Sequence, residues 1–376
     1  MFNLKDFYFC LPWVTPKEEE EEEEELFIPY LNEDIISNIL LKFPIESLEF
    51  KFRYVCKSWD SIISNKNFRN QHLHYSKSEP GLIIQVHDEY GYGTYFIDMK
   101  ERITKVQQLI KHNYFSKSLG FSNGLALVEW ETDGCRDLRV LNPITKLYLQ
   151  LPHHQACSSS LSRAHYGFGF AFVSSISKFK VICLVVCLDH KCQGYGKVQC
   201  AVLTLDSSNP KWRVIEGPPA MTNCICQNPP ISVNGYMYWH LYYPTNLVIS
   251  MDLIEEKFSE VGLPCSIGNL VEIEGHLSNI VIQPNHGLLE IWILKDVHGG
   301  QWVKQHSIIC HSLEELCHPT QIVSLRNEEI TIFDYGNKML YVFDVKLKKL
   351  KMMTEIKISG IIEICSPHVN SYFFSF

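Results

Sequence analysis

The chain has 376 residues, of which 46% are hydrophobic and 12% aromatic, so it is long enough to bury at least one large core. Its formal charge of −8 is matched by eight consecutive glutamates at positions 18 to 25, which leaves zero for the remainder. A nearly neutral folded part gives no general electrostatic reason for binding nucleic acid or an acidic membrane surface.

The first 26 residues read as an acidic leader. The run Glu18–Glu25 repels itself and has nothing to bury, so we expect residues 1–26 to be disordered, with a docking tail as the alternative. The N-terminus has no basic start, long apolar run or cleavage site, so the 14 cysteines are expected to be reduced. The longest apolar run, Val181–Leu188, is shorter than the about 20 residues of a membrane span. We therefore expect a soluble protein of the cytoplasm, the nucleus or both.

A helical pattern begins at Leu31. Asn32 can cap a helix, and Glu33 and Asp34 fall in the first turn, where the helix dipole favours acids. Apolar residues then recur at helical spacing, namely Ile35, Ile36, Ile39, Leu40 and Phe43. Pro44 ends this helix and suits the first position of the next.

Three more apolar groups lie between Pro44 and residue 76. The second helix is expected to bury Ile45, Leu48 and Phe52. The stretch "FRYVCKSWDSIIS" holds a cysteine, a lysine, serines and an aspartate, which are also the parts of a nucleophilic site. Its apolar members form one helical stripe, which consists of Val55, Cys56, Trp59, Ile62 and Ile63. A last short helix is expected to hold Phe68, His72 and Leu73. The sequence thus predicts a helical core rather than a reactive cysteine, in a unit so small that it needs a partner for stability.

From Glu79-Pro80-Gly81 to the end, the pattern changes to short alternating runs between turn residues, such as "GLIIQV", "LALVEW", "AVLTLD", "LVISMD", "ITIFDY" and "LYVFDV". No interval contains a long amphipathic helix, which argues against a βαβ enzyme fold and for an all-β domain.

A repeat runs through this region. An acidic or amide residue ends one strand of each unit, at Asp98, Asn142, Asp206, Asp252, Asp296 and Asp344. The intervals are 44, 64, 46, 44 and 48 residues, close to one propeller blade except for an insertion in the second. Asn-Gly hairpin signals precede two of these markers, at Asn123-Gly124 and Asn234-Gly235. The sequence therefore predicts an α+β multidomain chain, in which a small helical unit precedes an all-β propeller-like domain of about six units.

Three patterns suggest chemistry or ligand binding. Gly120-Phe-Ser-Asn-Gly124 matches the G-x-S-x-G nucleophile elbow, but a strand comes next where the elbow needs a helix. Cys183, Cys187, His190 and Cys192 cluster in a way that suggests zinc, yet Cys183 and Cys187 share one face of a strand, as core residues do. Tryptophans 212, 239, 292 and 302 fit packing between blades better than a ligand surface. We expect no catalytic residue, metal or cofactor.

The helical segment "LNEDIISNILLKFPIESLEFKFRYVCKSWDSIISNKNFRNQHL" closely resembles the F-box. The region after it resembles the F-box-associated domain of plant F-box/kelch-like proteins, through "SNGLALV", "NPITKLYLQLP", "YGFGF", "KWRV", "NGYMYWH" and "ISMDLIEEKFSEVGLP" in this order. The resemblance implies an F-box at residues 27–75 and a kelch-like β-propeller domain at residues 76–376. It also implies a non-catalytic substrate receptor of a Skp–cullin–F-box (SCF) ubiquitin ligase.

The resemblance further implies where partners bind. A Skp-type adaptor, which links the receptor to a cullin, would contact Leu31, Ile35, Ile39, Leu40, Phe43, Pro44, Ile45 and Leu48. The F-box core would consist of Val55, Cys56, Trp59, Ile62 and Ile63. A protein target would bind the β domain, and Tyr242 and Tyr243 are rim candidates because they come after a strand rather than alternate within it.

The chain departs from the F-box pattern at one position. Most F-boxes begin with Leu-Pro, whereas here Leu31 is followed by Asn32. This change could weaken adaptor binding, so the alternative function is a protein-binding propeller that acts outside a ubiquitin ligase. The residues name no substrate, because loop rims of propellers carry no general code.

Overall fold

The computed structural model describes residues 31–78, 81–98, 105–111, 116–132, 135–153, 166–186, 198–206, 209–218, 229–240, 247–265, 268–316, 320–326 and 328–368. The expected leader, residues 1–26, lies outside these ranges. The chain divides into two compact units, a helical unit that ends at Ser78 and a β unit that begins after it.

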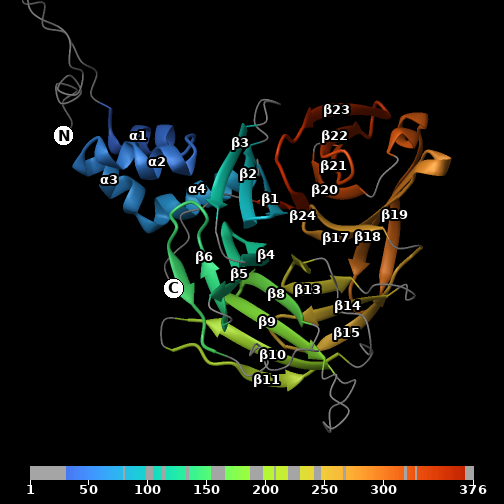
Figure 1. Cartoon of the computed structure of the whole chain (residues 1–376), viewed down its shortest axis with the longest axis horizontal. Coiled ribbons are helices and arrows are strands. Elements are labelled where there is room, and N and C mark those ends of the chain that lie inside the picture. Colours follow the sequence, from blue (N-terminus) through green and yellow to red (C-terminus); the bar gives the residue numbers. More distant parts are fainter. Residues whose placement is uncertain are drawn as a thin grey trace, which may run out of the picture. The chain divides into compact units, whose positions relative to one another are not determined.

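The helical unit contains α1 (Glu33–Leu40), α2 (Ile45–Phe50), the 3₁₀ turn η2 (Phe52–Tyr54), α3 (Lys57–Ser64) and α4 (Lys66–Ser78) (Figure 1). Its buried apolar side chains are Ile36, Leu40, Ile45, Leu48, Ile63, Phe68 and Leu73. Each of these contributes about 1.5–3 kcal/mol by leaving water. They come from all four α-helices, so no helix can be removed without opening this small core.

Three local expectations for the helical unit were wrong. Phe52 is not buried in the second helix, because α2 ends at Phe50 and Phe52 lies half-buried in η2. Pro44 is not the first residue of α2 but its N-cap, and its φ of −61° and ψ of 147° are the extended geometry typical of a cap. Val55 is not part of the core, since 42% of its surface is exposed. The reason is that α3 begins only at Lys57, after the extended residue Cys56, so the helical spacing that placed Val55 on the inner stripe does not reach it.

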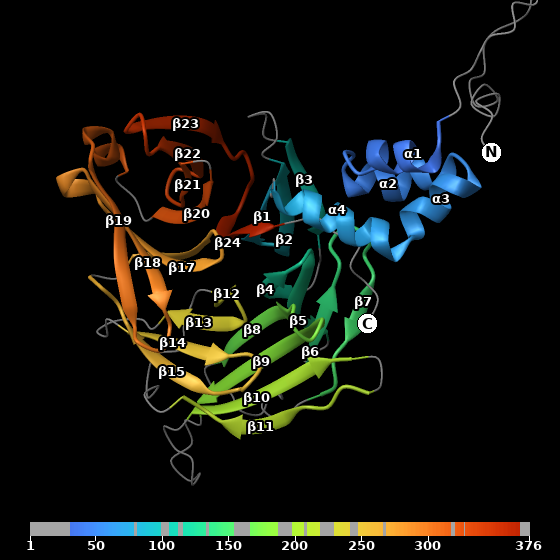
Figure 2. The same cartoon turned by 180° about the vertical axis from the view of Figure 1, so that it is seen from behind.

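The β unit consists of six four-stranded antiparallel sheets, the blades of a β-propeller, as the repeat predicted (Figures 1 and 2). We number the blades along the chain. Blade 1 contains β24 (Ile361–His368), β1 (Gly81–Asp88), β2 (Gly91–Asp98) and β3 (Lys105–Lys111). Blade 2 contains β4 (Ser116–Ser122), β5 (Leu125–Thr132), β6 (Cys135–Leu141) and β7 (Tyr148–Gln150). Blade 3 contains β8 (Tyr166–Val173), β9 (Lys178–Val186), β10 (Val198–Leu205) and β11 (Arg213–Glu216).

The remaining blades keep the same order. Blade 4 contains β12 (Ile231–Val233), β13 (Tyr236–His240), β14 (Leu247–Asp252) and β15 (Phe258–Gly262). Blade 5 contains β16 (Asn269–Ile273), β17 (His276–Gln283), β18 (Leu288–Asp296) and β19 (Gln301–Ile309). Blade 6 contains β20 (Thr320–Arg326), β21 (Glu329–Asp334), β22 (Met339–Asp344) and β23 (Lys349–Glu355). Short 3₁₀ turns, η5 (Pro284–His286) and η6 (His311–Glu315), lie in the fifth blade and after it.

The last strand of the chain closes the ring. β24 pairs with β1 in an antiparallel register that joins His368 to Gly81 and Cys365 to Ile84. Blade 1 is therefore built from both ends of the β unit, so the ring closes only after the whole propeller sequence has been assembled.

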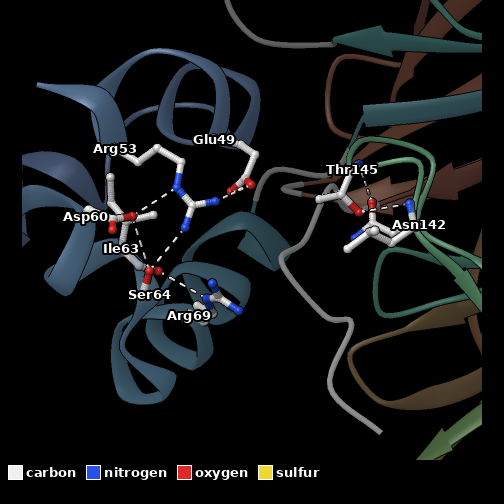
Figure 3. Close-up of polar contacts among 9 residues, drawn as sticks. Glu49, Arg53, Asp60, Ile63, Ser64, Arg69, Asn142 and Thr145 are labelled. Atoms are coloured by element: carbon white, nitrogen blue, oxygen red, sulfur yellow. Dashed lines mark hydrogen bonds and ion pairs between the residues drawn. The ribbon is translucent and has the colours of Figure 1, made fainter.

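The six repeat markers share one structural position. Asp98, Asp252, Asp296 and Asp344 end a strand of their blades, and Asn142 and Asp206 come directly after one. At Asn142, Asp252, Asp296 and Asp344 the side chain accepts hydrogen bonds from the backbone of the turn that comes next. For example, the Oδ1 atom of Asn142 accepts hydrogen bonds from the backbone N–H groups of Ile144 at 2.9 Å and Thr145 at 3.2 Å (Figure 3). The repeat therefore reflects a turn geometry that suits a short side-chain acceptor.

The two Asn-Gly pairs form the predicted hairpins. Asn123-Gly124 joins β4 to β5 and has φ angles of 47° and 81°, while Asn234-Gly235 joins β12 to β13 with φ angles of 49° and 81°. Two successive positive φ angles define the turn that matches the twist of a hairpin, and Asn and Gly adopt them most readily.

Apolar clusters between blades form the core of the propeller. Trp239 is fully buried with residues of blades 3 and 4, and Phe258 packs beside it. Two other tryptophans bridge blades through their indole N–H groups, Trp212 to the carbonyl of Pro152 at 2.8 Å and Trp302 to that of Gly262 at 2.7 Å. These three tryptophans serve packing between blades, as expected from the sequence.

Candidate functional site

Helix α1 has two apolar faces. Ile36 and Leu40 point into the core of the helical unit and are 5% and 0% exposed. On the other face Ile35 and Ile39 are 45% and 41% exposed. The same four-residue spacing continues to Leu31, just before the N-cap, and to Phe43, in the turn after the helix, which are 38% and 39% exposed. We call these four residues the exposed stripe. A row of solvent-exposed apolar side chains on one side of a short helix is typical of a surface that another protein covers.

Asn32 holds the first turn of α1. Its Oδ1 atom accepts a hydrogen bond from the backbone N–H of Ile35 at 2.9 Å, and its backbone is extended, as an N-cap requires. Glu33 and Asp34 lie in the first turn, where they interact favourably with the helix dipole. The expected cap is thus confirmed, and α1 forms without the proline that most F-boxes carry at this position.

The end of the stripe is fixed by aromatic and polar contacts. The ring of Phe43 meets the edge of Phe52 with centroids 4.7 Å apart, and Phe52 meets Trp59 in the same way at 5.7 Å. The Nε2 atom of His72, on α4, lies 2.9 Å from the carbonyl oxygen of Phe43. Phe43 is therefore held from η2 and α4 at once, although its own ring is partly exposed.

Arg53 joins the middle elements of the unit (Figure 3). Its guanidinium donates to Glu49 on α2, to Asp60 Oδ1 at 3.0 Å and to Ser64 Oγ at 3.1 Å, the last two on α3. Burial alone would lower the pKa of Arg53, but the hydrogen bonds and charges of Asp60 and Glu49 outweigh it and raise that pKa. Arg53 thus stays charged and fixes α2 against α3.

The eight residues predicted to contact an adaptor fall into two groups. Five are at the surface, which are Leu31, Ile35, Ile39, Phe43 and Pro44. Three are at most 1% exposed, which are Leu40, Ile45 and Leu48. The buried three support the exposed stripe from below and cannot touch a partner while the unit keeps this structure. Helical spacing could not separate the two groups, because α1 is apolar on both sides.

The predicted core residues also differ in burial. Ile63 is fully buried, whereas Cys56, Trp59 and Ile62 are half-buried and Val55 is exposed. Cys56 is the N-cap of α3 and makes no side-chain capping bond. Sequence reasoning missed apolar residues at the surface of this unit, among them Phe50 at the end of α2 and Tyr54 in η2. A signal for them existed, since both lie next to helix breaks where an apolar side chain need not point inward.

The comparisons with known proteins decide the family. The model of the F-box associated beta propeller domain matches residues 87–375, which is more than half of the chain and includes strands of all six blades. The chain belongs to the F-box associated beta propeller family. The expected fold and the expected family are both confirmed.

Several similar proteins come from a plant. F-box protein At3g07870 of Arabidopsis thaliana is 26% identical over 370 residues, which cover 85% of this chain and 86% of that protein. Putative F-box protein At1g46984 and F-box protein CPR1, from the same plant, are 25% and 21% identical, and each comparison covers 90% of both chains. Residues 87–375 make up less than 90% of the chain, so an alignment that covers 90% also includes the part of the chain that holds the helices.

Ser122 of this F-box associated propeller is not placed in a nucleophile elbow. It ends β4, and the hairpin at Asn123-Gly124 leads into the strand β5 rather than into a helix. Its hydroxyl oxygen accepts a hydrogen bond from the backbone N–H of Phe172, in the next blade, at 2.9 Å. The G-x-S-x-G match therefore arises from a hairpin and a contact between blades.

The other candidates are only partly within the described residues. Cys183 is buried within β9, where burial and its strand position make it a core residue, but Cys187, His190 and Cys192 lie outside the described ranges. Tyr242 and Tyr243 also lie outside them, in the connection between β13 and β14. Among the residues that the structure describes, no group of three or more His, Cys, Asp or Glu side chains could hold a metal ion. In the same part of the chain, every helix is too short or too polar to cross a membrane.

Proposed function

We propose that this protein is the substrate-recognition subunit of an SCF-type ubiquitin ligase. In this proposal residues 27–75 form an F-box that binds a Skp-type adaptor, and through it a cullin, while residues 76–376 bind a protein target. The receptor itself carries no catalytic residue, and it would act in the cytoplasm, the nucleus or both. The observation that carries the proposal is the exposed stripe of α1, in a chain whose relatives are named F-box proteins.

The physical argument starts from the stripe. Four large apolar side chains between 38% and 45% exposed are costly to leave in water, and a partner that covers them gains about 25 cal/mol for each Å² buried. The stripe is also held rigidly, by the Asn32 cap at one end and by the contacts of Phe43 at the other. A preformed surface loses little conformational entropy on binding.

The test measures binding of a purified Skp-type adaptor to the full chain by isothermal titration calorimetry. The double variant Ile35→Glu, Ile39→Glu is expected to weaken binding by about 3 kcal/mol or more, which is more than about a hundredfold in Kd. Asn38→Glu is the matched control, because Asn38 is exposed on the same helix and receives the same type of charge. Circular dichroism should show equal helicity in all three proteins.

Binding that is equally strong in the double variant would contradict the proposed interface. If the wild-type chain binds no adaptor at micromolar concentration, the alternative of a protein-binding propeller outside a ligase replaces the proposal. Asn32→Pro restores the usual F-box residue. If this variant binds the adaptor, Asn32 is the reason why the wild-type chain does not. Variants of Leu40, Ile45 or Leu48 are less informative, because these side chains are buried and their loss unfolds the unit.

A further inference from the structure

Blade 2 carries a stacked cation on its outer part. The guanidinium carbon of Arg139 lies 4.6 Å from the centre of the Trp130 ring and 5.0 Å from the centre of the Tyr148 ring. The three residues come from the adjacent strands β5, β6 and β7. We call them the Trp130–Arg139–Tyr148 ladder.

The strand register explains why they meet. Arg139 pairs with Val128 on β5 and with Gln150 on β7, while Trp130 pairs with Asp137 and Tyr148 with Leu141. Residues directly opposite each other in a sheet, and those two positions further along, share one face. The ladder is therefore built by the sheet itself and does not depend on a loop. On the same face Val128 and Leu141 are buried, whereas Tyr148 is 57% exposed and its chain neighbour Leu147 is 54% exposed.

Among the residues that the structure describes, the charge of Arg139 is only weakly neutralised. Its ion pair with Asp137 Oδ2 is long, at 3.8 Å, and its enclosed Nε atom has no hydrogen-bond partner in the described structure. By contrast, Arg213 lies 2.6 Å from Glu256, and Arg53 lies 3.0 Å from Asp60. A guanidinium has five N–H donors, and it binds a carboxylate best through two parallel hydrogen bonds in its own plane.

A second stacked cation in the propeller differs from Arg139 because it has a close carboxylate partner. Lys304 lies 4.6 Å from the centre of the Trp292 ring in blade 5, but its Nζ atom also bonds Glu290 at 2.6 Å. That hydrogen bond and charge lower the pKa of Glu290, so the pair is already satisfied. The ladder of blade 2 has the same kind of cation–aromatic stacking without such a close carboxylate in the part of the chain that the structure describes.

We propose that the Trp130–Arg139–Tyr148 ladder binds an acidic side chain of the target protein. Leu147 and Tyr148 would cover apolar residues of the target that lie next to this acidic side chain. This inference rests on the proposed function, since it assumes that the propeller captures a protein. Tryptophan, tyrosine and arginine are the residues that contribute most to binding at protein interfaces, and stacking between rings holds the guanidinium in place before binding. The acidic partner is indicated by charge complementarity.

The experiment uses the full chain and an array of ten-residue peptides with blocked ends. The peptides form matched pairs that differ only by Asp or Glu against Asn or Gln at one position. Among the peptides that bind, the acidic member is expected to bind about tenfold or more tightly, as for a hydrogen-bonded charge pair. Arg139→Gln and Tyr148→Ala should remove this preference, and Lys304→Gln, the matched control, should keep it. Asp137→Asn, which removes the internal competitor, should strengthen it.

Equal binding of acidic and amide peptides would overturn the proposal, as would an unchanged preference in Arg139→Gln. Absence of peptide binding to the full chain would overturn it too. The same holds if peptides bind only to a chain that lacks residues 1–26, because the ladder would then be occupied by the chain's own Glu18–Glu25 run. If Arg139→Gln does not fold, Arg139→Lys keeps the charge without the planar fork and should weaken the preference. Adaptor binding by the same full-length proteins is measured separately, so a failure there and a failure here are distinguishable.

Discussion

The Nε2 atom of His72 on α4 lies 2.9 Å from the carbonyl oxygen of Phe43, the last residue of the exposed stripe. Because a carbonyl can only accept, Nε2 carries the proton and donates. His72 is almost completely buried and its other ring nitrogen, Nδ1, lies 3.4 Å from the Ser76 hydroxyl. The contact links the C-terminal helix of the unit to the surface that we propose for adaptor binding.

His72→Phe is expected to lower the free energy of unfolding of the helical unit by about 1–2 kcal/mol, because the buried hydrogen bond is lost while the ring volume is kept. Urea denaturation followed by circular dichroism at a helical wavelength measures the change. His74→Phe is the control, since His74 is exposed on the same helix and its replacement should change stability by less than about 0.5 kcal/mol. Equal stabilities of the two variants would contradict this role of His72.

Ser122→Ala should destabilise the propeller by about 1 kcal/mol, because the backbone N–H of Phe172 loses the hydroxyl that accepts its hydrogen bond. Thermal unfolding measures the effect, with Ser232→Ala as control at an exposed strand position. A hydrolase would lose activity toward an ester substrate in this variant. Ester hydrolysis by the wild-type chain that disappears in Ser122→Ala would revive the nucleophile elbow.

Lys180 bridges blades 3 and 4. Its side chain is 5% exposed, its Nζ atom lies 2.7 Å from Glu256 Oε1, and it also donates to the carbonyl of Leu253. Burial alone would raise the pKa of Glu256, but the hydrogen bonds from Arg213 and Lys180 outweigh it and lower that pKa. Glu256 therefore adds stability above its unfolded pKa, and this stability is lost as the pH falls through the lowered folded value.

Lys180→Met is expected to lower the free energy of unfolding by about 2–3 kcal/mol. The loss is smaller than for a buried charge without any partner, because Arg213 still binds Glu256. Lys178→Met is the control, since Lys178 is 42% exposed in its ion pair with Asp206 and should matter by less than about 1 kcal/mol. Chemical denaturation of both variants measures these changes. Comparable losses of stability in the two variants would refute the stabilising role of Lys180 between blades 3 and 4.

The stability of the propeller should fall in acid because of His368, which lies on the ring-closing strand β24. Its imidazole is 3% exposed between the rings of Phe96 and Phe121, and burial lowers its pKa to about 3. The unfolded chain binds a proton below about pH 6.5 that the folded chain does not, so stability is complete above that pH and falls below it. The expected loss is about 1 kcal/mol between about pH 6.5 and 5.5.

His368→Phe should reduce this pH dependence, as measured by unfolding at a series of pH values. A smaller dependence of the same sign should remain, because burial also lowers the pKa of His240. An identical pH profile in the variant would show that His368 is not the group responsible.

The sequence by itself determined the features that depend on local chemistry. Asn32 predicted a helix start, the Asn-Gly pairs predicted hairpins, and the acidic or amide markers predicted six repeats, because these signals are local. Asn32 and Asn142 accept hydrogen bonds from backbone groups within a few positions, and the Asn-Gly pairs adopt the positive φ angles of a hairpin turn. These interactions do not depend on distant parts of the chain, so their spacing was enough to predict the helical unit and the propeller.

Only the tertiary structure decided which side of each element faces outward. Leu40 is buried and Ile39 exposed although both are apolar and adjacent, because the other helices of the unit cover one side of α1 and leave the other open. Val55 lies outside the core because the chain stays extended at Cys56. Arg139 meets Trp130 and Tyr148 through pairings across strands that no short stretch of sequence contains. Burial and contacts between strands depend on residues far apart in the chain, so local spacing cannot reveal them.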